Sequence, residues 1–403
     1  MAKESSSLSK QYSRRLVAEE LLHQAPLSRA ALARATGLSK QTMSLVIAEL
    51  ESEGWVRSVG ISKGAVGRTA ISYDLARDAA FSIGVDLGGT KVSLAIADLV
   101  GKTIAETTEP TDPRGGIHVF RQVRELARRL AAGRGLDLER ARSIVVGMPG
   151  VVDPDSGAVQ LVPNIAGLSS ISAPKTLADL FGQPVVIEND VNLAMFGEAW
   201  RGCAQGAQNA ALLAIGTGVG LGLIVNGQIA RGAKGAAGEI AYLPIGADLE
   251  SPNALNVGAF ELEAGAAGIL RRYHSRGGDR VDSVRELFNQ LAAGDHAAID
   301  AIGSVARSVA LAATALAAIL DPELIVLAGS IGVRAELADR VREATRSLYA
   351  RPIDIRVSAL GARAGIVGAV SLAVNRLHNA LFGMSGVPRE LTLPAAIVGR
   401  SAA

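Results

Sequence analysis

Two adjacent glycines after a short apolar strand constrain this chain more than any other feature. The strand spans 81–85, the turn reads Asp86-Leu87-Gly88-Gly89-Thr90-Lys91, and a second apolar run covers 92–97. The glycines let the backbone approach an anion where a Cβ would obstruct it, and such a turn points N–H groups at phosphate oxygens. Thr90 adds a hydroxyl donor, and the Asp86 carboxylate can hold a metal ion on the phosphates. The pattern predicts a phosphate-binding hairpin; the alternative is a hairpin that merely needs two glycines.

A turn of the same type occurs about 130 residues further along the chain. It reads Gly216-Thr217-Gly218-Val219-Gly220-Leu221-Gly222 and follows the apolar strand 210–215. A third glycine turn, Gly329-Ser330, follows the apolar run 324–327, where adenosine could rest. The repetition predicts an α/β protein in which two RNase-H-like lobes face one another across a cleft. The candidate ATP- and phosphate-binding residues are Asp86, Gly88, Gly89, Thr90, Lys91, Gly216, Thr217, Gly218, Gly220 and Gly329.

Polar residues at the end of another apolar strand are candidates for sugar chemistry. Residues 185–187 lead into Glu188-Asn189-Asp190. Phosphoryl transfer to a sugar needs a carboxylate that takes the hydroxyl proton, so Asp190 is the candidate base and Asn189 is expected to orient sugar hydroxyls. The alternative is that the pair caps a helix over 191–200, and Asp190 can serve both roles. Further candidates, in turns or after a glycine-rich stretch, are Gly150, Asn164 and Glu239.

The first 77 residues have a different pattern, with short helices followed by a hairpin. Helical spacing of apolar residues predicts a helix over 13–24, and Ser28 is expected to cap a second helix that stops at Gly37. Ser39 is expected to cap a third helix, and a hairpin follows over 55–75. This order predicts a winged helix-turn-helix. The alternative is a small protein-interaction module whose polar residues form a solvated face.

The third helix is the candidate recognition helix for DNA. If Met43, Val46, Ile47 and Leu50 are buried, the polar side chains face solvent, where they can bond base edges or phosphates. The hairpin loop adds cations that can reach the backbone or the minor groove. Residues 1–77 hold 11 Lys/Arg against 7 Asp/Glu, which suits a polyanionic partner. The candidate DNA-binding residues are Ser39, Lys40, Gln41, Thr42, Ser44, Lys63 and Arg68.

Composition bounds the class of protein. At 403 residues the chain suggests two or three domains, and 49% apolar with 20% charged residues is typical of a globular protein. The single cysteine, Cys203, excludes an internal disulfide framework and a multi-thiolate metal site. The apolar stretch 309–320 is too short to span a bilayer, and no signal-type apolar core is present near residue 1. We therefore expect a cytoplasmic protein without a membrane partner.

These motifs together resemble the ROK family of repressors, open reading frames and sugar kinases. Residues 86–91 match that family's first phosphate motif, 216–222 the second, and 188–190 the segment that carries the catalytic aspartate in kinase members. The resemblance implies a two-lobed actin-like sugar-kinase body behind the winged head, with ATP and Mg²⁺ as cofactors.

The family's sugar-and-zinc signature begins at Gly238-Glu239-Ile240 but is not completed. The histidine position holds Tyr242, and aligning Gly258-Ala259-Phe260-Glu261 on its end places Pro252, Ala254 and Ala259 at the cysteine positions. None of these residues is a good zinc ligand, so we expect no structural zinc and no metal site. The alignment leaves Tyr242 and Glu261 as sugar contacts.

The first functional hypothesis is a sugar-responsive transcriptional regulator, a repressor, that binds operator DNA and senses a sugar or sugar derivative. Symmetric operators favour a homodimer or homotetramer. The alternative is an active ATP-dependent hexose kinase, similar to glucokinase, with a fused DNA-binding head; whether turnover persists stays open. The expected domains are 1–77 (winged head), 78–193 (small lobe, with a C-terminal helix at about 363–378 packing back), 194–362 (large lobe) and 379–403 (tail).

Overall fold

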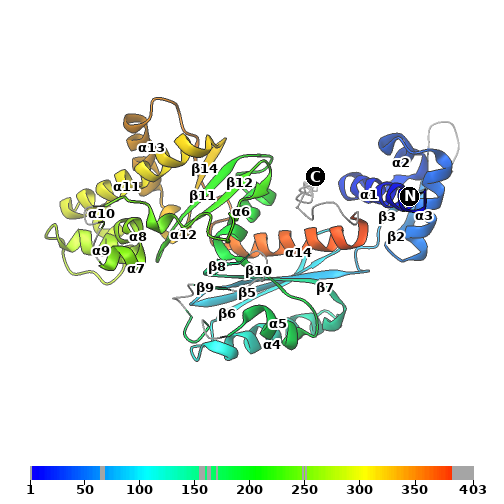
Figure 1. The fold of residues 1–403 in the computed structure, drawn as a ribbon, viewed down its shortest axis with the longest axis horizontal. Helices are drawn as coiled ribbons and strands as arrows, with labels where there is room; N and C mark the ends of the chain where they lie inside the picture. The colour runs from blue at the N-terminus through cyan, green and yellow to red at the C-terminus, as the bar shows by residue number, and fades with distance from the viewer. Residues whose placement is uncertain are drawn as a thin grey trace. The chain divides into compact units, whose positions relative to one another are not determined.

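The computed structural model describes residues 2–63, 69–153, 159–160, 165–168, 171–246, 249 and 252–383. Contacts divide the chain into two compact units (Figure 1). Unit 1 comprises Met1–Gly147, Asn164–Ile187 and Ala369–Ala403, and unit 2 comprises Met148–Pro163 and Glu188–Gly368. The head predicted over 1–77 thus falls in the same unit as the first lobe. The division of the chain into four domains stays a prediction.

The N-terminal segment of unit 1 has the three helices and the hairpin predicted from the sequence, with two differences. The first helix begins at Ala2 and not at residue 13, and a short strand that the sequence did not predict, β1, precedes the second helix. Ser28 caps the second helix by accepting a hydrogen bond from Ala31 N (3.2 Å), and that helix ends at Gly37 with a φ of 71°. Ser39 caps the third helix by accepting from Thr42 N (3.1 Å). The strands pair in the order β1–β3–β2. The elements are α1 (Ala2–Gln24), β1 (Leu27–Ser28), α2 (Arg29–Thr36), α3 (Lys40–Ser52), β2 (Val56–Lys63) and β3 (Thr69–Leu75).

This segment, called the head below, shares its core with the rest of unit 1. The predicted buried face of α3 is confirmed, since Met43, Val46, Ile47 and Leu50 are at most 4% exposed. The same cluster of buried residues includes Leu99 and Val100, which follow β5, and Leu377 and Phe382 near the end of α14. His378 adds a hydrogen bond to Leu99 O (2.6 Å). The head is therefore packed against the rest of unit 1 and not only tethered to it.

The sheet of unit 1 has the strand order β10–β7–β4–β5–β6. Strand β4 pairs antiparallel with β5 and parallel with β7. Figure 1 shows α4 and α5 on one face of this sheet and α14 on the other. Gly84 permits the close approach of α14, because a Cβ there would overlap the backbone of Ala369 and Val370. The elements are β4 (Phe81–Leu87), β5 (Lys91–Asp98), β6 (Thr103–Pro110), α4 (Gly116–Ala132), η1 (Leu138–Arg140), β7 (Ala141–Met148), α5 (Ala173–Phe181), β10 (Val186–Asn189) and α14 (Ala364–Phe382).

Unit 2 repeats this sheet in the order β15–β14–β11–β12–β13. Strand β11 pairs antiparallel with β12 and parallel with β14, as β4 does with β5 and β7. The predicted duplication is therefore present in the fold. The elements are β8 (Val151–Val152), β9 (Val159–Gln160), α6 (Asp190–Arg201), β11 (Ala210–Ile215), β12 (Val219–Val225), β13 (Gln228–Ile229), η2 (Ile240–Tyr242), α7 (Pro252–Val257), α8 (Ala259–Ala264), α9 (Ala266–His274), α10 (Val284–Ala292), α11 (His296–Leu320), β14 (Leu324–Ala328), α12 (Gly329–Gly332), α13 (Ala335–Leu348), β15 (Ile355–Val357) and η3 (Gly361–Arg363).

Helix α11 forms the centre of the core of unit 2. Its apolar face packs with α13 and one face of β11 and β14, whereas α6 contacts β12 and β11. Among the residues that the structure describes, α11 is the one helix long and apolar enough to cross a membrane, but half of its most apolar part is buried inside the protein. Burial of this kind is typical of a core helix.

Candidate functional site

The turn 86–91 of unit 1 joins β4 to β5. Gly88 N donates to Lys91 O (2.9 Å), which closes the turn. Thr111, just beyond β6, braces it from the side, because its Oγ1 donates to Gly88 O (2.6 Å) and its N–H to Thr90 O (3.1 Å). Gly89, Thr90 and Lys91 are exposed, and Asp86 is half-buried at the strand end. The predicted loop is thus a braced turn with a solvent-facing tip.

The turn 216–218 of unit 2 joins β11 to β12 and is held by a carboxylate. Gly216 N donates to Gly218 O (2.9 Å), and Val219 N donates to Glu261 Oε2 (2.9 Å). A Cβ on Gly218 would overlap the Glu261 carboxylate, so glycine is needed for this approach. Glu261, predicted as a sugar contact, therefore lies against the second glycine turn.

The later glycines of that motif have a packing role. Gly220 and Gly222 lie within β12, and a Cβ on either would crowd α6 at Val191 or Met195. Glycine at these positions lets β12 approach the helix that begins at Asp190. The sequence pattern did not separate this role from phosphate binding, which was predicted for Gly220.

A pocket of about 650 Å³ opens beside the second glycine turn. Its lining includes Gly216, Thr217 and Ser330, and the Arg334 guanidinium lies 4.5 Å from the ring centroid of Phe288 in its wall. Gly329 has a φ of 79° and starts α12 next to Ile215. The two glycine turns predicted for unit 2 are thus adjacent, whereas the Arg334 and Phe288 contributions had no signal in the sequence.

Asn189 and Asp190 occupy the junction between β10 and α6. Asn189 caps the helix by accepting from Val191 N (2.9 Å) and Asn192 N (3.0 Å), and its Nδ2 donates to Gly150 O (3.0 Å). Asp190 is the first residue of the helix, and its carboxylate also accepts from Val191 N (2.9 Å). The capping interpretation is therefore correct for Asn189, and it leaves the Asp190 carboxylate at a helix N-terminus.

Three carboxyl groups of unit 2 have raised pKa values. Burial raises the pKa of Asp190 and that of Glu261. The pKa of Glu239 is raised first by desolvation and then by the negative charges of Glu261 and Asp190. Because the charges of both residues act on Glu239, Glu261 and Asp190 each lie near it. Together they form an acidic, hydrogen-bond-accepting cluster suited to the hydroxyl groups of a neutral ligand.

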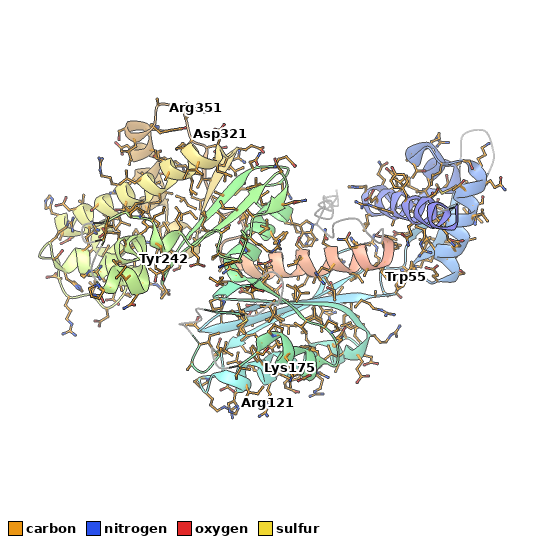
Figure 2. The ribbon with its side chains drawn as sticks, in the orientation of Figure 1. Trp55, Arg121, Lys175, Tyr242, Asp321 and Arg351 are labelled. Atoms are coloured by element: carbon orange, nitrogen blue, oxygen red, sulfur yellow. The ribbon has the colours of Figure 1, made fainter. Side chains whose placement is uncertain are left out.

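The segment aligned on the family's zinc signature is held by packing. The Tyr242 hydroxyl donates a long hydrogen bond to Asn256 O (3.4 Å), and the side chain is 47% exposed (Figure 2). Ala254 and Phe260 are buried. Gly258 has a φ of 100°, and a Cβ there would overlap the backbone of Ala241. Among the described residues no group of three His, Cys, Asp or Glu could hold a metal ion, and the apolar residues at the cysteine positions do not fit zinc.

The candidate DNA-binding residues of the head divide into two groups. Lys40, Gln41 and Ser44 are exposed on α3. The hydroxyls of Ser39 and Thr42 lie 2.9 Å apart at the N-cap, which gives both a structural role. Lys63 ends β2. Arg68 and the sugar candidate Asn164 lie outside the described residues.

Comparison with known proteins identifies the family. The ROK family profile matches residues 82–376. The chain belongs to the ROK family. It is 25% identical to the xylose repressor of Caldicellulosiruptor bescii, covering 92% of this chain and 97% of the repressor. It is 28% identical to the glucokinase of Halalkalibacterium halodurans, covering 71% of this chain and 92% of the kinase.

Two solved structures share the fold. A ROK family transcriptional regulator, described as a homologue of the E. coli MLC protein, has a TM-score of 0.75 at 22% identity and covers 93% of this chain and 98% of its own. A ROK family glucokinase from Streptomyces griseus in complex with glucose and AMPPNP has a TM-score of 0.60 at 27% identity and covers 73% of this chain and 99% of its own.

Proposed function

We propose that this protein is a cytoplasmic, sugar-responsive repressor that binds operator DNA through its head and a sugar through unit 2. The observation that carries the proposal is the extent of similarity: xylose repressors match the chain over 92% of its length, head included, whereas a glucokinase matches 71%. Two-fold symmetric operators are read by paired heads, so the proposal includes a homodimer or homotetramer.

The head supplies the DNA-binding surface of the proposal. Helix α3 places Lys40, Gln41 and Ser44 on its exposed side, opposite its buried face. Amide and hydroxyl groups can bond base edges, and the lysine can neutralise a phosphate. The hairpin of β2 and β3, with Lys63 and Arg68, supplies the wing.

The operator contact is tested with Gln41→Ala and Lys40→Ala. Gln41→Ala should weaken binding to a selected operator sequence more than binding to unrelated DNA, while Lys40→Ala should weaken both and reduce the salt dependence. Arg346→Ala, an exposed arginine on α13, is the matched control. If neither head variant changes a gel shift, α3 is not the recognition helix.

The sugar and nucleotide site is assigned to the acidic cluster and the glycine turns. The hydroxyl groups of the sugar would be bound by Asn189, Asp190, Glu239 and Glu261, together with Gly150, Asn164 and Tyr242. In unit 2, the turn at 216–218 and the pocket beside Gly329 are proposed to bind the nucleotide. In unit 1, the turn at 86–91 is proposed to bind phosphate, with Asp86 available to Mg²⁺. Bound ATP would supply a transferable phosphoryl group.

A second function, sugar kinase activity, is favoured by one observation. Burial raises the pKa of Asp190, which brings it closer to the working pH of a general base, and the residue directly follows Asn189, the candidate sugar ligand. ADP release with a hexose should then be abolished in Asp190→Ala and retained in Asn256→Ala, an exposed position on α7. Turnover that is absent, or independent of Asp190, would leave the repressor function alone.

A further inference from the structure

Beside the candidate sugar site lies a buried carboxylate that the proposed function does not use. Glu188 is 4% exposed and immediately precedes Asn189. Its Oε1 accepts from Asn189 N (2.9 Å) and Asn192 Nδ2 (3.0 Å). Its Oε2 accepts from Arg231 Nε (2.9 Å) and Nη2 (2.7 Å). The Oε1 contacts fix this carboxylate against the junction of β10 and α6, where Asp190 lies.

Arg231 begins the loop that ends at Glu239. Ala237 N donates to Arg231 O (3.0 Å), which closes the loop on its first residue. Gly238 has a φ of 96°, and a Cβ there would overlap Leu221 O, so the chain bends sharply against β12 just before Glu239. The loop is thus compact, with the ion pair at its start and a candidate sugar ligand at its end.

The ion pair therefore joins the two parts of the candidate site, which lie about 50 residues apart in the sequence. The Glu188 side chain is buried and the Arg231 side chain is 30% exposed. Removing the arginine would therefore leave an uncompensated carboxylate in a buried position. Such a pair holds its two segments in one relative geometry. Precise placement of the groups around a ligand matters, since a misplacement of about 1 Å can cost on the order of 100-fold in the rate of a catalysed reaction.

We propose that Arg231 and Glu188 are positioning residues for the sugar site, resting on the proposed function. Neither contacts the ligand. Their ion pair holds Asn189 and Asp190 at a fixed distance from Glu239, so that hydroxyl groups of one sugar reach all three. Sugar affinity then depends on the pair beyond its contribution to folding.

The test is calorimetric titration of the full chain with a panel of aldopentoses, aldohexoses and N-acetylhexosamines. Arg231→Met, which keeps much of the side-chain volume, should weaken binding at least 10-fold, and Arg231→Lys should restore most of the loss. Glu188→Gln should also weaken binding, and the double variant should lose less than the sum of the single losses. Arg351→Met is the matched control, because Arg351 forms an exposed ion pair with Asp321 in the same unit (Figure 2).

Each of the following outcomes would overturn the positioning role of the ion pair. Binding by Arg231→Met equal to that of the wild type overturns the positioning role and leaves the proposed function standing. A loss that tracks a lower unfolding midpoint, and that Lys does not restore, also overturns it in favour of a purely structural role. A wild-type protein that binds no sugar of the panel overturns the proposed function and this inference with it.

Discussion

Glu239, a proposed sugar ligand, carries an unfavourable charge. Its pKa lies above the usual value because of desolvation and the carboxylates of Glu261 and Asp190. A carboxyl group whose pKa is higher in the folded state than in the unfolded state destabilises the fold when ionised. That cost is present at neutral pH and is relieved as pH falls through the raised pKa towards the ordinary one.

Glu239→Gln should therefore raise the melting temperature at pH 7, and the difference from wild type should shrink towards pH 4, while sugar affinity falls. Glu125→Gln is the control with the opposite sign, because Arg128 lowers the pKa of Glu125. Thermal unfolding at both pH values measures the effect. A lower melting temperature for Glu239→Gln at pH 7 would mean that the ionised carboxylate stabilises the fold.

Helices α6 and α14 cross in unit 2 at a contact that excludes side chains. A Cβ on Gly368 would overlap Leu193 O, and one on Gly197 would overlap Ala364 O. Glu198, fully buried on α6, adds hydrogen bonds from Leu360 N (3.0 Å) and Ser358 Oγ, in the segment before α14. The helix that begins at Asp190 is thereby fixed to the start of α14.

Gly368→Ala should destabilise the protein by about 1–3 kcal/mol, since the added methyl overpacks a backbone contact. Gly303→Ala, on the exposed side of α11 with nothing within 4 Å of its Cβ position, should instead stabilise by about 0.5–1 kcal/mol. Urea unfolding compares the two. Equal effects would show that the crossing tolerates a side chain.

At the scale of single helices and strands, the sequence predicted the features that depend on residues close together along the chain. The caps at Ser28 and Ser39, the buried face of α3 and the repeated strand–turn–strand pattern follow from local periodicity and turn chemistry. Contacts between distant segments did not follow, because pairing over 40 or more residues leaves no local pattern. Glu261 bound to Val219 N, and Arg231 bound to Glu188, are of this type.

At the scale of the whole molecule, the head and the rest of unit 1 share a hydrophobic core, which determines whether the two unfold together. Leu377 of α14 is fully buried in the cluster that also holds α1 and α3 of the head. A head with a common core should unfold together with unit 1. Of the two tryptophans, Trp55 lies in the head and Trp200 in α6, so Trp200→Phe leaves a fluorescence probe of the head alone.

In that background Leu377→Ala should lower the free energy of unfolding reported by Trp55 by about 2–5 kcal/mol through the cavity it creates. Leu255→Ala, 69% exposed on α7, should change it by less than about 0.5 kcal/mol. A Trp55 transition indifferent to Leu377→Ala would identify the head as an independent folding unit.

The central claim, that a sugar controls DNA binding, is tested most directly by anisotropy titration of the full chain on DNA selected by the protein from a random library. At fixed salt, the sugar that binds in calorimetry should change the dissociation constant for the selected DNA at least about 5-fold, the lower range of allosteric coupling. The same sugar should leave binding to unrelated DNA unchanged. Failure to enrich any sequence, or a bound sugar without effect on DNA affinity, would contradict the account.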